Sequence, residues 1–389
     1  MGKKIDDRLP RDLGLKVLPG HAAIKSPWEK LYGFHDVMHY DERYNSLVSA
    51  LIMQAFRIVL PDYLERTNLM CDVSYNAQRW MVPLGLAVLN VHPFFKGNFL
   101  GALGADCGDD SGLMCGRVND FGTYRVEKEL DVCYWDVVGS ELCRSTIYGL
   151  QGGSEACGEK FRDGPNIEFH MVEAKGCGDR HCRVVAESRD KWPMPKKPEK
   201  WEHFGPVATA DMIKFTPDEE CLKESPWFRG ECDYLFANGT NSEVDEAGTV
   251  GGCIQNTPGT MIIIPAVMEA IKKGLFKEEA FDNALKCVCE AAGKAAFGDF
   301  FAREGLRAWL GVPREIGDDD GRVLGGYIEM YLQAMVAGYE VEAFNKDEVI
   351  YVIDKSAIFG GNPKWIIALI AYWYGMSKTL INAQWALWE

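Results

Sequence analysis

The chain has 389 residues, of which 47% are hydrophobic and 25% charged, and it carries a formal net charge of −15 at pH 7. This composition is typical of a folded protein with enough apolar material for a core, and the length favours two domains. The negative charge argues against nucleic acid or an anionic membrane as a partner, because binding to phosphates needs a basic surface.

The first elements predicted along the chain are helical. Residues 41–66 place apolar side chains at the spacing of one long amphipathic helix. A second apolar stretch, residues 79–95, is broken by Pro83 and Pro93. Residues 123–135 then alternate between apolar and polar side chains, which predicts a strand.

A helix and a hairpin are predicted next. Residues 136–153 resemble a helix that ends in glycines, and residues 166–187 form two strands joined across Gly176 to Asp179. Prolines and lysines then dominate residues 190–204, which makes this segment the best domain boundary. We therefore expect two domains, residues 1–190 and residues 205–389.

The second domain repeats part of the pattern of the first. Residues 122–142 and 337–358 each place a Tyr-x-Val-Glu strand after a glycine, with an apolar and acidic stretch and a helix behind it. Duplication and chance both explain such short matches. The predicted fold class is α/β (α+β), with two related halves that each contain a small antiparallel sheet flanked by helices. Helical patterns also run from about Met261 to Leu310.

The cysteines and the apolar segments bear on the cell compartment. There are thirteen cysteines, an odd number at uneven intervals, which is typical of free thiols in a reducing cytoplasm. The longest apolar run begins at Trp365 and has about half the length that a bilayer requires. The N-terminus has no apolar segment behind its charges. We expect a cytoplasmic protein without membrane contact.

The predicted hairpin contains potential metal-binding side chains that a turn does not require. A hairpin uses the Gly-Asp of its turn but has no need for Cys177 and Cys182, whose thiolates can reach one ion. Zinc takes such soft ligands in tetrahedral geometry, and Cys133 at the end of the preceding strand is the obvious third ligand. Buried cysteines also behave as small apolar residues, so the spacing leaves both interpretations open. The candidates for a fourth ligand are Glu173, His170 and His181.

Three segments together resemble a known family: "DVCYW", "ELCRSTIYGLQGG" and "HMVEAKGCGDRHCRVVAESRDKWP". They are similar to the 4-vinyl-reductase domain, the aromatic-sensing input module of bacterial activators of phenol and xylene catabolism. Cys133 matches the first cysteine of the family motif, Cys182 the last, and Gly178 and Asp179 the turn. The resemblance covers residues 120–192. It implies a zinc site beside a pocket for a small aromatic ligand, and a homodimer.

The chain departs from the family in the middle of the motif. The positions of the family's central glutamate and cysteine hold Met171 and Ala174 here. The nearest candidates, Glu173 and Cys177, lie closer to the turn. Either the hairpin has shifted in register and these two residues substitute, or the metal site is lost or altered. The candidate metal ligands are Cys133, Glu173, Cys177 and Cys182.

Two functions remain open. The chain has no Walker motif and no basic recognition segment, which argues against a transcription factor. The resemblance also extends to hydrolases of the 2-amino-thiazoline-carboxylate type, which implies an enzyme that opens a small cyclic or aromatic compound by hydrolytic or lyase chemistry. A zinc ion or the Cys133 thiolate would act on the substrate, with His170 or His181 moving the proton. The alternative is a sensor that binds a small aromatic ligand and keeps a structural zinc.

Other candidates are weaker. Cys287 and Cys289 point to opposite faces if their segment is helical, which favours core packing over a shared metal. Asp136 and Glu141 are a possible acid and base pair, although carboxylates on helices are commonplace. The glycine-rich segments do not fit a dinucleotide fingerprint, so we expect no nucleotide cofactor.

Overall fold

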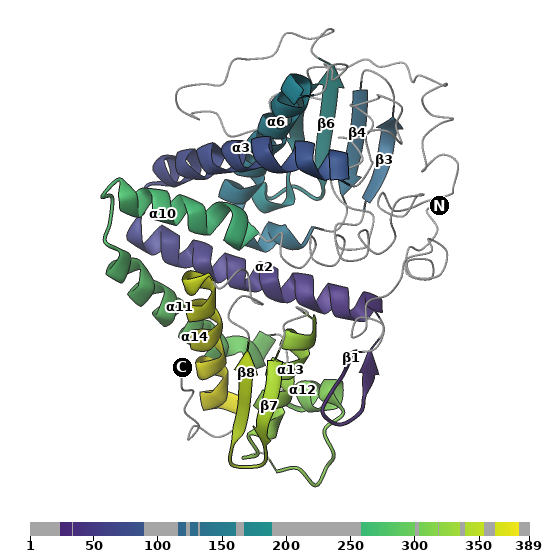
Figure 1. Cartoon of the computed structure of the whole chain (residues 1–389), viewed down its shortest axis with the longest axis vertical. Coiled ribbons are helices and arrows are strands. Elements are labelled where there is room, and N and C mark those ends of the chain that lie inside the picture. The colour runs from purple at the N-terminus through teal and green to yellow at the C-terminus, as the bar shows by residue number, and fades with distance from the viewer. Residues whose placement is uncertain are drawn as a thin grey trace. The chain divides into compact units, whose positions relative to one another are not determined.

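The computed structural model describes eleven parts of the chain (Figure 1): residues 24–32, 34–88, 116–121, 125–130, 133–160, 167–188, 258–299, 303–317, 319–334, 339–353 and 362–380. These parts combine helices with small antiparallel sheets, which confirms the predicted mixture of α and β structure. None of the described helices is long and apolar enough to cross a membrane.

The chain divides into two compact units. The first unit comprises Met1–Lys16 and Asp62–Val250, and the second comprises Val17–Pro61 and Gly251–Glu389. The boundary expected at residues 190–204 lies outside the described residues. The sequence placed residues 17–61 with the first half, whereas the structure groups them with the second unit, because the helix they contain packs against helices of the C-terminal half.

The described part of the first unit combines helices with a four-stranded sheet. Its elements are α3 (Tyr63–Val88), β3 (Gly116–Phe121), β4 (Arg125–Leu130), the short helix η2 (Tyr134–Val138), α6 (Ser140–Lys160), β5 (Ile167–Glu173), the short helix η3 (Lys175–Cys177) and β6 (Cys182–Ser188). The strands are antiparallel in the order β3-β4-β6-β5. The helix and the hairpin are therefore confirmed, with β5 and β6 paired as expected. The predicted strand is confirmed over Arg125–Leu130, whereas Tyr134 and Trp135 at the end of the predicted range lie in η2.

Helices α3 and α6 of the first unit approach each other closely because glycines line the contact. A Cβ atom on Gly149 would clash with the Ser74 hydroxyl, and one on Gly152 would clash with the Tyr75 carbonyl. A buried ion pair also joins the two helices, with Arg66 Nη2 at 2.9 Å from Glu141 Oε1. The start of α6 is thereby held in a fixed position against α3.

The two faces of the four-stranded sheet differ in polarity. On β5 and β6, buried Phe169, Val184 and Ala186 share one face, and α6 packs against β5. The alternate positions of the strands carry polar side chains that are nonetheless buried. These polar side chains are Glu127, Glu129, Glu168, His170 and Glu187.

The second unit is mainly helical. Its elements are β1 (Ile24–Lys25), β2 (Leu31–Tyr32), α2 (Phe34–Val59), η6 (Gly259–Ile263), α10 (Ile264–Lys272), α11 (Glu278–Asp299), α12 (Arg303–Leu310), α13 (Arg322–Ala334), β7 (Tyr339–Phe344), β8 (Val349–Ile353) and α14 (Pro363–Leu380). The helical pattern predicted from Met261 to Leu310 is confirmed. Strands β7 and β8 form an antiparallel hairpin.

The long helix predicted over residues 41–66 is wrong at its C-terminal end. Helix α2 ends at Val59, and α3 begins at Tyr63. Pro61 explains the break, since proline has no N–H to donate and disfavours helical backbone in the residue before it. The Asp62 carboxylate then accepts a hydrogen bond from the Glu65 N–H at 2.8 Å and caps the next helix.

The second unit has an aromatic core with internal hydrogen bonds. Trp365 Nε1 donates to the Tyr331 hydroxyl at 3.2 Å, and that hydroxyl donates to Asn45 Oδ1 at 3.3 Å. Trp373 Nε1 donates to the Tyr44 hydroxyl at 2.7 Å. All five side chains are buried, so this aromatic set is packed as core.

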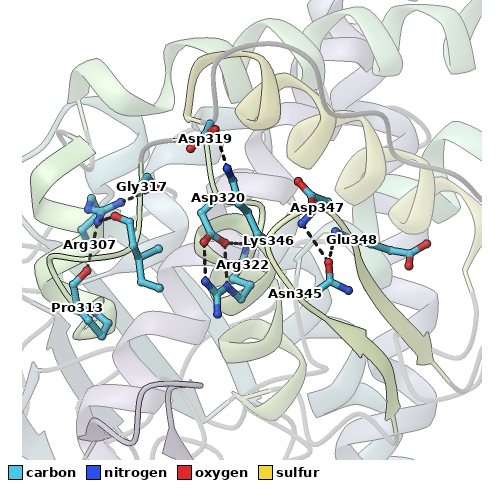
Figure 2. Close-up of polar contacts among 11 residues, drawn as sticks. Arg307, Pro313, Gly317, Asp319, Asp320, Arg322, Asn345, Lys346, Asp347 and Glu348 are labelled. Carbon is cyan, nitrogen blue, oxygen red and sulfur yellow. Dashed lines mark hydrogen bonds and ion pairs between the residues drawn. The ribbon is translucent and has the colours of Figure 1, made fainter.

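The connection from α12 to α13 is held by side chains that bind backbone (Figure 2). Arg307 donates to the carbonyls of Pro313 and Gly317 at 3.5 and 3.3 Å. Asp320 caps α13, since its Oδ1 accepts from the Arg322 N–H at 3.0 Å and its Oδ2 accepts from the Arg322 guanidinium at 2.6 Å. Asp319 pairs with Lys346 at 3.2 Å, next to the β7–β8 turn.

The two Tyr-x-Val-Glu segments occupy different places in their sheets. Val126 and Glu127 lie in β4, the second strand of the β3–β4 hairpin, whereas Val341 and Glu342 lie in β7, the first strand of the β7–β8 hairpin. The sequence match therefore does not align equivalent strands. What the units share in chain order is a hairpin followed by a helix, α6 in the first unit and α14 in the second.

Candidate functional site

Four cysteines of the first unit gather where the β5–β6 turn packs against η2 and the start of α6. Cys133 immediately precedes η2, Cys143 lies in the first turn of α6, Cys177 ends η3, and Cys182 begins β6. The short helix η3 contacts both η2 and α6. All four cysteines are free thiols. We call this set the thiol cluster.

The turn that carries Cys177 has a well-defined backbone. The Asp179 carboxylate accepts a hydrogen bond from the Ala174 N–H at 2.8 Å, and the Cys177 N–H donates to the Ala174 carbonyl at 2.9 Å. Gly178 has a φ angle of 102°, in the left-handed region that favours glycine. The Gly-Asp pair thus closes a tight turn that presents the residues around Cys177 to the segment before α6.

Backbone and side-chain contacts place each sulfur. The Lys175 N–H donates to Cys182 Sγ at 3.4 Å. Cys143 Sγ lies against Gly176, where an added Cβ would be 2.5 Å from the sulfur. The pKa shifts of the thiols pair Cys133 with Cys182 and Cys143 with Cys177. The cluster therefore consists of two thiol pairs.

The pairing perturbs the acidity of all four thiols. The hydrogen bond to Cys182, together with burial, raises the pKa of Cys133 well above its ordinary value, and the hydrogen bond from Cys133 lowers the pKa of Cys182 to about 7. In the same way the pKa of Cys143 is raised, and the pKa of Cys177 is lowered to about 7 by the hydrogen bond from Cys143 and by Arg144. Each pair thus favours one thiolate, the form that binds metals.

The donor set of the thiol cluster suits a soft metal ion. Thiolate sulfur selects zinc over magnesium and calcium. Within the described residues, no group of three or more His, Cys, Asp or Glu side chains is placed so that it could hold a metal ion. The sulfurs fit zinc by their chemistry, but their side chains would have to move to share one ion.

The remaining predicted site residues contact ionisable side chains of the sheet and its turn. Glu173 Oε2 lies 2.7 Å from His181 Nε2 and 3.4 Å from Arg183 Nε. The other ring nitrogen of His181 lies 3.8 Å from Glu129 Oε1. His170 is buried on β5, with its Nε2 at 3.6 Å from Glu168 Oε1. The structure thus brings Cys133, Cys177 and Cys182 together and engages Glu173 and the histidines with charged neighbours on the strands.

Sequence reasoning missed Cys143. Its position in a helix gave no spacing that matches a known metal motif. It joins the thiol cluster because α3 holds the start of α6 beside the hairpin turn. The sequence held two further cysteines between Cys133 and Cys177, namely Cys143 and Cys157, and no spacing marked Cys143 as the member of the cluster.

The other candidates have structural contacts. Asp136 Oδ2 pairs with Lys175 Nζ at 3.7 Å and links η2 to η3, while Glu141 is the buried partner of Arg66. Cys287 is exposed and Cys289 is buried, which confirms that they face opposite sides of α11. Burial raises the pKa of Cys289 to about 12, as expected for an unreactive core thiol.

Comparison of the sequence with models of protein families gives no match, and comparisons with curated proteins and with solved structures give none either.

Proposed function

We propose that the first unit is a small-molecule-binding module similar to the 4-vinyl-reductase domain, in which a zinc ion ties the β5–β6 turn to the segment before α6. The ligand is a small aromatic or cyclic compound. The observation that carries the proposal is that two cysteines meet at η3: Cys182 accepts a hydrogen bond from the Lys175 N–H of η3 at 3.4 Å, and Cys133 precedes η2, which contacts η3. These two residues match the outer cysteines of the family motif, and they come from opposite sides of α6 in the sequence.

A structural role for the zinc fits the surroundings of the cluster. Cys143 and Cys182 are 7% and 4% exposed and Cys133 is half-buried, so protein encloses most of the cluster, whereas Cys177 at the turn is exposed. The Lys175 N–H already donates to Cys182 Sγ, which stabilises the thiolate form. A catalytic zinc instead keeps a coordination position open for water or substrate. The enclosed sulfurs therefore favour binding over catalysis.

An enzyme is the second candidate, and one contact favours it. His181 Nε2 and Glu173 Oε2 lie 2.7 Å apart, and the His181 side chain is 25% exposed. A carboxylate that orients an accessible imidazole is a common arrangement for general acid and base catalysis. In this alternative, the protein opens a small cyclic compound by hydrolysis or elimination. Cys133 suits it less as a nucleophile, because its thiol is protonated and bonded to Cys182.

The order of elements supports a related proposal, that the two units share an ancestor. Each unit contains an antiparallel hairpin followed by a helix: β3–β4 before α6, and β7–β8 before α14. In each, glycines allow that helix to pack tightly against a long helix, α6 against α3 and α14 against α11. Among the described residues, only the first unit has the clustered thiols.

Metal content and ligand binding test the proposed function together. We expect about one zinc per chain in protein made with zinc present, measured by elemental analysis. Phenols and related ring compounds should raise the melting temperature without being consumed, whereas C182S should lose zinc and melt at a lower temperature. Turnover of a cyclic compound that H181N abolishes would favour the enzyme instead. Protein without zinc would contradict the metal role directly.

A further inference from the structure

We propose that Cys143 is the fourth zinc ligand, so that Cys133, Cys143, Cys177 and Cys182 form a tetrathiolate site and Glu173 is not a ligand. The proposal rests on the zinc of the proposed function and names the complete ligand set of that site. It also explains how the chain tolerates Met171 and Ala174 at the positions where the similar family has a glutamate and a cysteine. Two cysteines replace that pair, one on α6 and one on the turn.

Cys143 packs closely against the β5–β6 turn. Its sulfur lies over Gly176, where even one methyl group would be 2.5 Å away. Gly176 has no positive φ angle, so its backbone does not require glycine. What requires glycine is the space taken by Cys143 Sγ. The helix and the turn are therefore fitted around this sulfur atom.

The short helix η3 brings the sulfurs of the cluster to one place. Cys177 ends η3, the Lys175 N–H of η3 donates to Cys182 Sγ at 3.4 Å, and Cys143 Sγ lies against Gly176 of η3. Cys133 precedes η2, which contacts η3. A metal ion beside η3 would therefore have Cys143 in the same group of thiols as the three predicted cysteines.

Glu173 is engaged by partners other than the cysteines. Its carboxylate pairs with His181 at 2.7 Å and with Arg183 at 3.4 Å, and these contacts hold neighbouring positions of β5 and β6 together. Its side chain is 35% exposed, whereas Cys143 is 7% exposed. Glu173 would have to give up its contacts with His181 and Arg183 to reach the metal.

The negative charge of a tetrathiolate site requires positive groups nearby. Four thiolates around Zn²⁺ leave a net charge of about −2, which needs neighbouring cations or N–H donors when it is partly buried. Arg144 and the Lys175 ammonium favour the thiolates of Cys177 and Cys182, while Asp179 and Asp136 oppose them. The Lys175 N–H donates to the Cys182 sulfur as well. The surroundings thus already contain cations for a tetrathiolate.

Cobalt substitution tests the ligand set without any assay of activity. The full chain is stripped with a chelator and titrated with Co²⁺, whose absorption reports tetrahedral geometry and the number of bound thiolates; Zn²⁺ competition then gives the affinity. Wild type should show a four-thiolate spectrum. C143S should show a three-thiolate spectrum and bind zinc at least about tenfold more weakly. E173Q is the matched control and should keep the wild-type spectrum and affinity.

A second variant covers the case in which C143S does not fold. G176A keeps all four thiols but places a methyl group against Cys143 Sγ, so it should weaken metal binding or alter the cobalt spectrum. C287S, in the second unit, should change neither. If E173Q loses a ligand while C143S and G176A keep the wild-type spectrum, Cys143 is not a ligand. The zinc site of the proposed function would still be supported by that result. If wild type binds no metal, both the zinc site of the proposed function and the ligand set proposed here are refuted.

Discussion

At the scale of single residues, the buried charges of the first unit matter most for stability. Arg66 and Glu141 are 5% and 3% exposed, and their atoms meet at 2.9 Å. A buried pair adds little net stability compared with apolar residues, because both charges lose water. Removing one partner is costly, since the other charge is then left buried without compensation. This pair also sets the position of α6, and with it the position of Cys143.

We expect E141A to destabilise the protein by about 3–5 kcal/mol and R66M/E141L to recover most of that loss. K272A is the control, because Lys272 belongs to an exposed pair with Glu269 and its loss should cost less than about 1 kcal/mol. Chemical denaturation with circular dichroism measures all three. A loss for E141A no larger than that for K272A would show that the buried pair does not hold the helices together.

Asp320 makes a second prediction at this scale, about pH. The hydrogen bond from the Arg322 guanidinium holds the pKa of the Asp320 carboxyl below its ordinary value. A carboxyl whose pKa is lowered by folding stabilises the protein above its unfolded pKa of about 4. That contribution is lost as the pH falls through the lower, folded pKa.

D320N should therefore lower the melting temperature at pH 7, and the difference from wild type should shrink as the pH falls below about 4. E315Q is the control, since Glu315 is an exposed residue of the same loop. Melting curves from pH 7 to pH 3 measure the effect. A difference that stays constant over this range would mean that the ionised carboxylate of Asp320 is not what stabilises α13.

At the scale of elements, glycines decide how closely the helices pack. A Cβ on Gly375 of α14 would clash with the Glu290 carbonyl of α11, and a Cβ on Gly293 would clash with the Tyr372 carbonyl. The same device brings α6 against α3 through Gly149 and Gly152. Gly305 in α12 differs, because nothing lies within 4 Å of its Cβ position.

We expect G375A to destabilise the protein by about 1–3 kcal/mol, because the added methyl group must push the α11 backbone away. G305A should instead stabilise it by about 0.5–1 kcal/mol, because alanine loses less conformational freedom than glycine in an open helix position. Both changes are Gly to Ala in helices of the same unit, so thermal unfolding compares packing directly. Equal effects of the two would contradict the close contact between α11 and α14.

At the scale of the whole molecule, the sequence determined the features that depend on neighbours along the chain. The alternation after residue 123 predicted β4, the Gly-Asp turn predicted the β5–β6 hairpin, and the helical period predicted α10 and α11. Local rules suffice for these elements because side-chain period and turn chemistry act within a few residues. The end of α2 was missed although Pro61 marks it, since the apolar period continues across the proline.

Only the tertiary structure decided which side chains meet. The sequence named Cys133, Cys177 and Cys182, but it also offered Glu173 and two histidines, and it gave no reason to include Cys143. Close packing of α6 on α3 brought Cys143 to the turn, and the charges of neighbouring strands drew Glu173 to His181 and Arg183. The grouping of α2 with the C-terminal helices was decided in the same way. Contacts between residues far apart in the chain depend on packing and charge in three dimensions, which no local pattern records.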